Sequence, residues 1–286
     1  MRKRRHRRGR YTHGVLRTAV PEDLPPLRDL ARRANDAPYD LETVLEEKCF
    51  GAGVAGKPSA RIFESEGAIR GVAVTCGRFL RLVAVDREHR RRGIGTALLR
   101  DSNAEVIGAE GGNYFTPGVA DSDGGTMAFF RRRGYRETAA TWNLHAEIEA
   151  GASPGDGGPL TRRSATLSPL RRGEGIDGAL MDFVRREFGP VWAFEVSRAR
   201  SAFWIEQAGF AVIEANNRGL GTFGPAGVAK GERGKGHGRA LLLAALEELA
   251  RLGHPRAIIP WTDAFEFYRK SCGAEPAHRF VTFTSP

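Results

Sequence analysis

The segment Arg-x-x-Gly-x-Gly occurs twice in this chain, at Arg90–Gly95 and at Arg233–Gly238. In both copies an apolar run typical of a β-strand leads into the segment, and apolar residues at helical spacing follow it. A valine also stands five residues before the arginine in each copy, at Val85 and at Val228. The same strand, turn and helix therefore occur twice, which indicates that a whole domain is duplicated.

The turn between this strand and this helix is suited to binding an anion. The first backbone N–H groups of a helix have no partner within the helix, and the helix dipole places partial positive charge at the same end. Glycine removes side chains that would obstruct a ligand, and arginine offers forked donors to phosphate oxygens. We therefore expect a pyrophosphate at each turn. The predicted ligands are Arg90, Arg91, Arg92, Gly93, Ile94, Gly95 and Thr96 in the first copy and Arg233, Gly234, Lys235, Gly236, His237, Gly238 and Arg239 in the second.

Two other phosphate-binding motifs fit the chain less well. A dinucleotide fingerprint needs a third glycine three residues after the second, and Leu98 and Leu241 stand at those positions. A P-loop needs Gly-Lys followed by Ser or Thr, and the sequence does not contain it.

The middle of the chain has the composition of a linker. Residues 151–159 contain four Gly and two Pro and no large apolar side chain. We therefore expect a basic disordered tail over 1–13, an N-terminal domain over 14–148, a Gly/Pro linker over 149–164 and a C-terminal domain over 165–286.

Charge and cysteine content restrict the class of protein. Seven of the first ten residues are Lys or Arg, and without them the net charge of +10 falls to +3 (10 − 7). Nucleic acid is therefore expected to bind only nonspecifically, through this tail, if it binds at all. Three scattered cysteines predict neither a disulfide framework nor a metal site, and they fit a reducing cytoplasm. The sequence contains no apolar run of about 18 residues, so it predicts no membrane span.

Hydrophobic spacing predicts the remaining elements. The first half predicts strands over 15–19, 60–64, 69–76 and 79–85 and helices over 24–31 and 39–49, with Glu66-Gly67 as a hairpin turn. The second half predicts a helix over 176–188 and strands over 210–215 and 220–228. Its opening strand is not identified, and region 189–208 gives no clear pattern.

The turns and a second motif together resemble the GNAT superfamily of N-acetyltransferases. Its turn, Arg/Gln-x-x-Gly-x-Gly/Ala, lies between the fourth strand and the third helix. Residues Met127–Tyr135 and Ala264–Ala274 are similar to the family's Ala-x-x-Phe-Tyr-x-x-x-Gly-Phe helix. The resemblance implies an α/β protein with two GNAT-like domains, each a mixed twisted sheet splayed between its fourth and fifth strands and flanked by helices. The fifth strands would be about 113–116 and 256–261.

The resemblance also implies a reaction. Acetyl-CoA would be the cosubstrate, without a metal, and a small-molecule primary amine would attack the acetyl group directly. Backbone amides near Val85 and Val228 would hold the pantetheine and polarise the thioester carbonyl. Tyr268 matches the family's proton donor, whereas Phe130 stands at that position in the first half. The first domain would therefore use Tyr114 or water, or do no chemistry, and the C-terminal domain is expected to be catalytic.

Several assignments remain open from the sequence. Glu195, Glu214 and Glu266 are equal candidates for the general base, His237 is interpreted as part of the turn, and Asp263 as the N-cap of the last helix. The acceptor ranges over amino sugars, aminoglycosides, small amines, amino acids and protein N-termini. The alternative function is a non-catalytic protein that binds acyl-CoA or nucleic acid.

Overall fold

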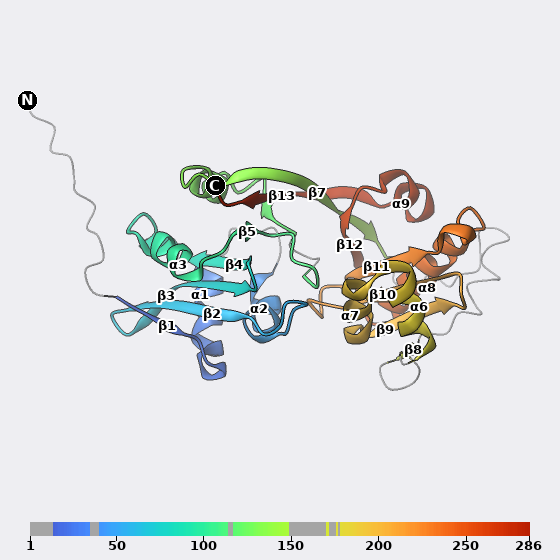
Figure 1. The fold of residues 1–286 in the computed structure, drawn as a ribbon, viewed down its shortest axis with the longest axis horizontal. Coiled ribbons are helices and arrows are strands. Elements are labelled where there is room, and N and C mark those ends of the chain that lie inside the picture. Colours follow the sequence, from blue (N-terminus) through green and yellow to red (C-terminus); the bar gives the residue numbers. More distant parts are fainter. Residues whose placement is uncertain (1–13, 35–39, 114–116, 149–169, 172–175, 177) are drawn as a thin grey trace, which may run out of the picture. The chain divides into compact units, whose positions relative to one another are not determined.

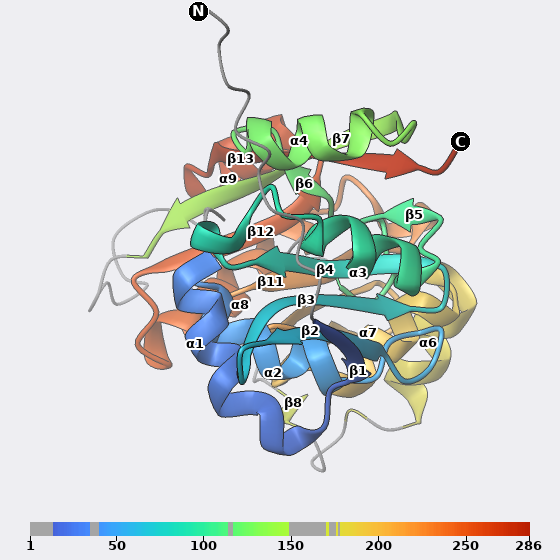
Figure 2. The ribbon, with the colours of Figure 1, turned by 90° about the vertical axis from the view of Figure 1, so that its left-hand side faces the viewer.

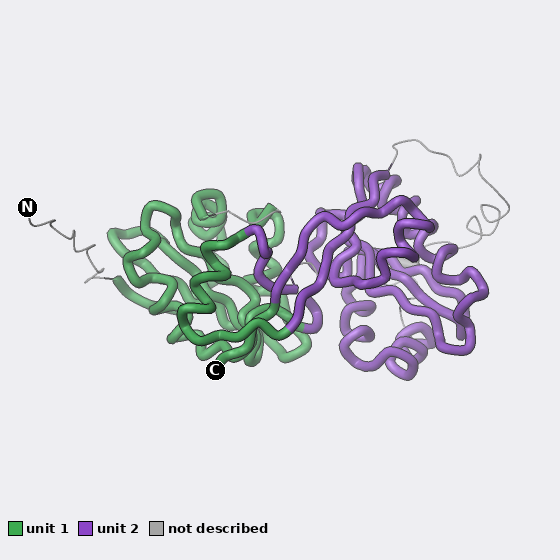
Figure 3. Tube along the Cα trace, turned by 90° about the horizontal axis from the view of Figure 1, so that it is seen from above, with its two compact units in different colours: residues 1–110, 123–138, 282–286 green, residues 111–122, 139–281 purple. Residues whose placement is uncertain are grey.

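The computed structural model describes the chain except for residues 1–13, 35–39, 114–116, 149–169, 172–175 and 177. The predicted tail and linker lie outside the described residues. Contacts divide the chain into two compact units (Figure 3). Unit 1 runs to Glu110 and also contains Asp123–Thr138 and Thr282–Pro286, and unit 2 contains Gly111–Ser122 and Ala139–Val281. Strands β7 (Arg136–Glu147) and β13 (Glu275–Thr284) therefore have residues in both units.

Unit 1 is built on a mixed sheet in the order β1-β2-β3-β4-β5 (Figures 1 and 2). Its strands are β1 (Val15–Thr18), β2 (Ser59–Ser65), β3 (Ala68–Cys76), β4 (Phe79–Val85) and β5 (Val106–Ile107). Neighbours are antiparallel except β4 and β5, and the last residues of β13 pair antiparallel with β5. The strands predicted for this half, and the hairpin at Glu66-Gly67, are confirmed. Both turn residues have positive φ, 53° and 68°, as a tight hairpin turn requires.

Helices cover both faces of the sheet of unit 1. They are the 3-10 helix η1 (Pro21–Asp23), α1 (Leu24–Ala34), α2 (Leu41–Phe50), the 3-10 helix η2 (Arg87–His89), α3 (Ile94–Ser102) and α4 (Gly124–Arg131). Six consecutive residues of β3, from Gly71 to Cys76, are buried. Because neighbouring side chains of a strand point to opposite faces, this run is buried on both.

Unit 2 contains an antiparallel sheet in the order β11-β10-β9-β8 and a second pair, β12 with β7. Its own strands are β6 (Val119–Ala120), β8 (Leu170–Arg171), β9 (Ser201–Ile205), β10 (Gly209–Ile213), β11 (Phe223–Val228) and β12 (Arg256–Thr262). Its helices are α6 (Ala179–Phe188), α7 (Pro190–Arg198), the 3-10 helix η3 (Lys230–Glu232), α8 (His237–Arg251) and α9 (Phe265–Cys272). Region 189–208, unassigned from sequence, holds α7 and β9.

Both units have a sheet that opens at one end. In unit 1, β4 pairs with β5 only through Phe79 and Leu80, and β4 then continues to Val85. In unit 2 a single parallel bridge, Thr222 with Ile258, joins the start of β11 to β12. The predicted splay between fourth and fifth strands is therefore present in each unit.

The fifth strand of unit 2 lies at Arg256–Thr262, as predicted. The corresponding prediction for unit 1, residues 113–116, is wrong, because the parallel partner of β4 is Val106–Ile107. Residues 114–116 themselves lie outside the described residues.

Candidate active site

The two glycine turns have the same geometry at the starts of α3 and α8. Gly93 and Gly236 are the N-cap residues, with φ of 95° and 86°, and neither helix has a side-chain cap. A Cβ at either glycine would meet nothing within 4 Å, so glycine is needed there for its backbone conformation and not for space. The first N–H groups of each helix are thus left for an anion.

This requirement predicts the effect of a single methyl group. Gly236→Ala is expected to lower the free energy of unfolding by about 1–2 kcal/mol, because a Cβ is disfavoured at positive φ. Gly231→Ala is the matched control: it also has open space around it, and its φ is not positive. Denaturant unfolding of both variants measures the difference, and equal stabilities would show that the turn tolerates a side chain.

In unit 1 the second glycine of the turn, Gly95, lies where the end of β4, the start of α3 and helix α4 meet. A Cβ on Gly95 would stand 3.2 Å from the ring of Phe129 in α4 and 3.6 Å from Cγ2 of Val85 at the end of β4. The opening of the sheet is therefore bordered by these three residues.

Unit 2 repeats this arrangement with its own residues. A Cβ on Gly238 would stand 3.4 Å from the ring of Phe267 in α9 and 3.6 Å from Cγ2 of Val228. Phe267 is 40% exposed, which is unusual for a large apolar side chain. The structure therefore brings each predicted turn together with its predicted downstream helix.

The first arginine of each motif shapes the turn. Arg90 Nε donates to the carbonyl of Val85 (3.1 Å) and its Nη2 to that of Ala34 (2.7 Å). Arg233 Nε donates to the carbonyl of Val228 (3.3 Å). In both copies the guanidinium thus ties the loop to the strand end, a role that charge alone did not suggest.

The other predicted ligands of the first copy differ in exposure. Arg91 and Arg92 are exposed, whereas Ile94 is buried in the core, so Ile94 can offer only its backbone. Thr96 Oγ1 accepts a hydrogen bond from Nη2 of Arg133, a residue that sequence reasoning missed. Arg91 has φ of 64°, a conformation that glycine usually occupies.

In the second copy Gly234 takes the place of Arg91, with φ of 80°. Lys235 Nζ lies 2.8 Å from Glu232, and His237 Nε2 lies 3.3 Å from the same carboxylate. Arg239 follows on the first turn of α8. His237 is the first residue of α8 and lies beside Glu232.

Tyr268 lies at the base of the opening in unit 2. Its ring contacts those of Phe223, the first residue of β11 (centroids 6.1 Å apart), and of Phe267 (5.0 Å). Burial, with a smaller effect of the Cys272 thiol, raises the pKa of Tyr268 to about 12. The phenol is therefore protonated at neutral pH, and within the described part of the chain its hydroxyl has no hydrogen-bond partner.

Phe130 takes the equivalent place in unit 1 and is fully buried. Its ring packs on Tyr135 and Phe283, each with centroids 5.6 Å away. Tyr135 donates its own hydroxyl to the carbonyl of Ala104 (2.7 Å). Tyr114, the alternative donor, lies outside the described residues.

A buried ion pair fills the base of the opening in unit 1. Arg81 follows the last β4 residue that pairs with β5 and occupies a bulge in the register with β3. Its Nε lies 2.8 Å from Glu110 Oε2, and its Nη1 donates to the Gly51 carbonyl (2.7 Å). The two charged side chains are only 3% and 2% exposed. A Cβ on Gly53 would stand 2.5 Å from both, so the loop packs directly on the pair.

The strand β11 of unit 2 has a bulge at the corresponding place, where Gly224-Pro225 stand between Phe223 and Ala226. No charged side chain occupies these positions. The two openings thus differ at their base: an ion pair in unit 1, and an aromatic residue beside Tyr268 in unit 2.

The three candidate bases have different surroundings. Glu214 is buried, pairs with Arg200 and His254 (both 3.1 Å) and accepts the N–H of Gly219, so it holds its loop in place. Glu266 is exposed on α9 and pairs with neighbouring cations of the same helix.

Glu195 is fully buried in α7 and accepts from Asn216 Nδ2 at 2.8 Å. The interpretation of Asp263 as an N-cap is wrong, because Ala264 caps α9 and its N–H bonds to Thr262 Oγ1. Glu195 is thus buried like Glu214 and unlike the exposed Glu266, and one of its contacts is the hydrogen bond from Asn216.

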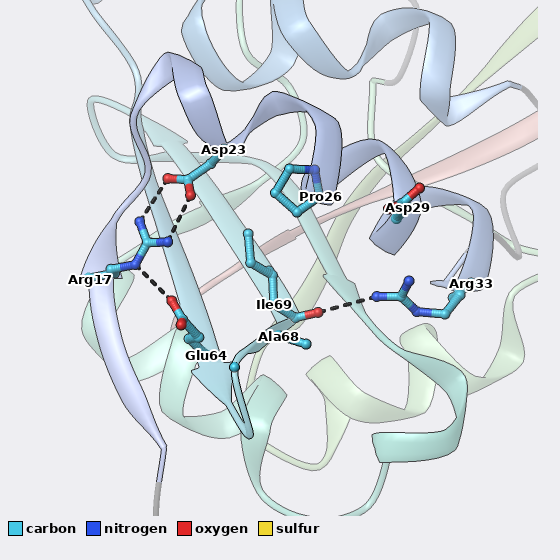
Figure 4. Close-up of a pocket in the computed structure, with 9 residues that line it drawn as sticks. Arg17, Asp23, Pro26, Asp29, Arg33, Glu64, Ala68 and Ile69 are labelled. Atoms are coloured by element: carbon cyan, nitrogen blue, oxygen red, sulfur yellow. Dashed lines mark hydrogen bonds and ion pairs between the residues drawn. The ribbon is translucent and has the colours of Figure 1, made fainter.

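A surface pocket of unit 1 is lined by residues of β1, η1, α1 and the β2–β3 hairpin, and by none of the glycine turn (Figure 4). Arg17 in it bonds to both Asp23 and Glu64, and Arg33 reaches the carbonyl of Ile69. Because these charges already satisfy one another, the pocket is not the candidate site. Among the described residues, no cluster of three or more His, Cys, Asp or Glu could hold a metal ion, and no helix is long and apolar enough to cross a membrane.

Comparison with known proteins agrees with this geometry. Residues 48–137 match the sequence model of the acetyltransferase (GNAT) domain, a range that includes the first glycine turn and α4. No curated protein shows significant similarity to the chain. Residues 48–137 are therefore similar in sequence to a GNAT acetyltransferase domain.

Solved structures share the fold of nearly the whole chain. A tandem GNAT protein from the clavulanic acid biosynthesis pathway has a TM-score of 0.63 at 18% identity, covering 96% of this chain and 98% of that one. The glucosamine N-acetyltransferase region of a fungal multi-domain GH3 β-N-acetylglucosaminidase has 0.67 at 17%, covering 95% of this chain but only 38% of that one. A GNAT protein from Sphaerobacter thermophilus has 0.60 at 18%, covering 94% of each chain. The α/β fold with mixed sheets and flanking helices is thus the GNAT fold.

Proposed function

We propose that this protein is an acetyl-CoA-dependent N-acetyltransferase that acts on a primary amine and that unit 2 is its catalytic module. The observation that carries this assignment is the difference at one position. Tyr268 places a protonated phenol at the base of the opening in unit 2. Phe130 takes the equivalent position in unit 1, where its buried ring has no hydroxyl that could donate a proton.

The residues of unit 2 fit the cosubstrate. The uncapped N–H groups at the start of α8, with Gly234 and Gly236 at positive φ, suit a pyrophosphate. The strand end at Val228 borders the opening that a pantetheine arm would enter. When bound, acetyl-CoA supplies an activated acetyl thioester. The protein's part is to align the amine, stabilise the developing oxyanion with backbone N–H groups and let Tyr268 donate a proton to the departing thiolate.

Unit 1 is proposed to bind acyl-CoA without transferring it. It has the same uncapped helix start, but the base of its opening holds the Arg81–Glu110 pair and Phe130. Neither the ion pair nor Phe130 supplies the phenol that Tyr268 offers in unit 2. The cytoplasm is the proposed location, since all three cysteines are free thiols.

The test is transfer by the purified full-length protein. With acetyl-CoA and an amine panel of an amino sugar, an aminoglycoside, a polyamine, an amino acid and a peptide N-terminus, we expect free CoA and one acetylated amine in equal amounts. A thiol-reactive dye measures CoA, and mass spectrometry identifies the product. Tight binding of acetyl-CoA with no acetylated product from any amine would favour the non-catalytic alternative.

A further inference from the structure

One arginine of unit 1 is fixed against the start of α3. Arg133 lies over the ring of Phe129, with Cζ 3.6 Å from the centroid. Its Nη1 donates to the carbonyl of Phe129 (2.8 Å), and its Nη2 donates to Thr96 in the first turn of α3. The Arg133 guanidinium is thus already fixed next to the glycine turn, so binding a ligand there would cost little further side-chain entropy.

The surroundings of Arg133 are positive. The pKa of the Arg133 guanidinium is lowered mainly by burial. The nearby charges of Arg132, Arg100 and Arg91 lower it further. Within the described residues, none of these four arginines forms an ion pair with a carboxylate, and the buried Nε of Arg133 has no hydrogen-bond partner. Like charges gathered without a counter-ion cost free energy, which an anionic ligand would offset.

The four corresponding positions of unit 2, Gly234, Leu243, Lys270 and Ser271, hold no unpaired cation. Counting from the aromatic residues that border each opening, Ser271 stands in the place of Arg133 and Lys270 in that of Arg132. Lys270 pairs with Glu266 (3.3 Å), and Lys235 in the turn pairs with Glu232 (2.8 Å). Among the described residues the cluster of four arginines therefore occurs only in unit 1, whereas the second turn has Arg233 and Arg239 as its cations without an ion pair.

CoA carries a second phosphate group besides its pyrophosphate, a 3′-phosphomonoester on the ribose. The N–H groups at the start of α3 suit the pyrophosphate, which leaves the nearby guanidinium groups for the phosphomonoester. We propose that the cluster of Arg91, Arg100, Arg132 and Arg133 binds the 3′-phosphate of CoA and makes unit 1 the tighter of two acyl-CoA sites. This inference rests on the proposed function only in requiring that the protein binds CoA.

The test compares CoA with dephospho-CoA by titration calorimetry on the full-length protein, at low and at raised salt. The wild type is expected to bind CoA more tightly than dephospho-CoA, with a preference that shrinks as salt rises. Arg133→Gln is expected to weaken CoA binding about 10- to 100-fold and to leave dephospho-CoA nearly unchanged, because it removes charged hydrogen bonds to one phosphate. Lys270→Gln in unit 2 is the matched control and should keep the preference.

The outcomes separate this inference from the proposed function. Equal binding of CoA and dephospho-CoA by the wild type, or an unchanged preference in Arg133→Gln, would overturn the inference while leaving the enzyme assignment intact. Loss of binding to a short DNA duplex in Arg133→Gln, without loss of CoA binding, would also overturn it and assign the cluster to nucleic acid. If CoA binds nowhere, the proposed function fails as well. Thermal unfolding checks that Arg133→Gln is folded, and Arg132→Gln, at a position outside the core, repeats the test.

Discussion

Arg81→Met is expected to lower the free energy of unfolding by about 3–5 kcal/mol, because it leaves the carboxylate of Glu110 buried without its counter-charge. The pair is almost fully removed from solvent, and Gly53 packs directly against it. Arg81 also donates to the Gly51 carbonyl, so the same change frees a backbone acceptor at the end of α2. Urea unfolding followed by circular dichroism measures the loss.

Two further variants test whether burial is the cause. Arg81→Met combined with Glu110→Leu removes both charges and is expected to recover most of the stability. Arg28→Met breaks the exposed pair with Glu46 (3.4 Å) and is expected to cost less than about 1 kcal/mol. If the Arg81 variant lost no more than the Arg28 variant, the pair would be exposed to water and the base of the opening in unit 1 would be unfilled.

This pair shows where sequence reasoning reached its limit. Arg81 stands in an apolar run, between Leu80 and Leu82, and its partner Glu110 comes after β5. The sequence spacing of the two residues does not predict that they form an ion pair. The apolar run also contains no residue that indicates a β-bulge in β4. Only the folded sheet brings them together.

The elements that the sequence predicted well are those with strong local signals. The Glu66-Gly67 hairpin, the two glycine turns and strand Arg256–Thr262 each depend on a few adjacent residues with restricted backbone preferences. Strand β5 was missed because two residues, Val106 and Ile107, are too short for a periodic pattern. Helix α7 begins at Gly189-Pro190, a pair that by composition reads as a loop although proline is favoured at a helix start.

The same contrast holds within the candidate site. Charge predicted that Arg90 and Arg233 would bind phosphate, but their hydrogen bonds to Val85 and Val228 depend on the path of the loop. Position in a motif predicted Tyr268, and the structure adds its packing on Phe223. Backbone conformation and motif position are local, whereas side-chain partners are a property of the fold.

Tyr268→Phe is expected to reduce kcat about 10²- to 10⁴-fold with little change in the binding of acetyl-CoA, since general acid catalysis contributes about that much. Burial raises the pKa of the phenol to about 12, so it stays protonated through the neutral and mildly alkaline range and loses its proton only as the pH rises toward 12. A phenol of ordinary pKa near 10 would begin to fail as a donor about two units lower. The wild-type kcat should therefore not decline between pH 8 and about 10 through ionisation of this group.

Tyr135→Phe in unit 1 is the matched control, because it also removes one phenolic oxygen. The Tyr135 hydroxyl donates to the Ala104 carbonyl, so its loss is expected to cost about 1 kcal/mol of stability and to leave turnover unchanged. Tyr268→Phe should do the reverse, since its hydroxyl has no partner within the described residues whose loss would destabilise the fold. Equal turnover in the two variants would remove Tyr268 from the mechanism. If Tyr268→Phe lost turnover only in proportion to a loss of stability, the role of Tyr268 would be packing on Phe223. Proton donation requires that Tyr268→Phe loses turnover at unchanged stability.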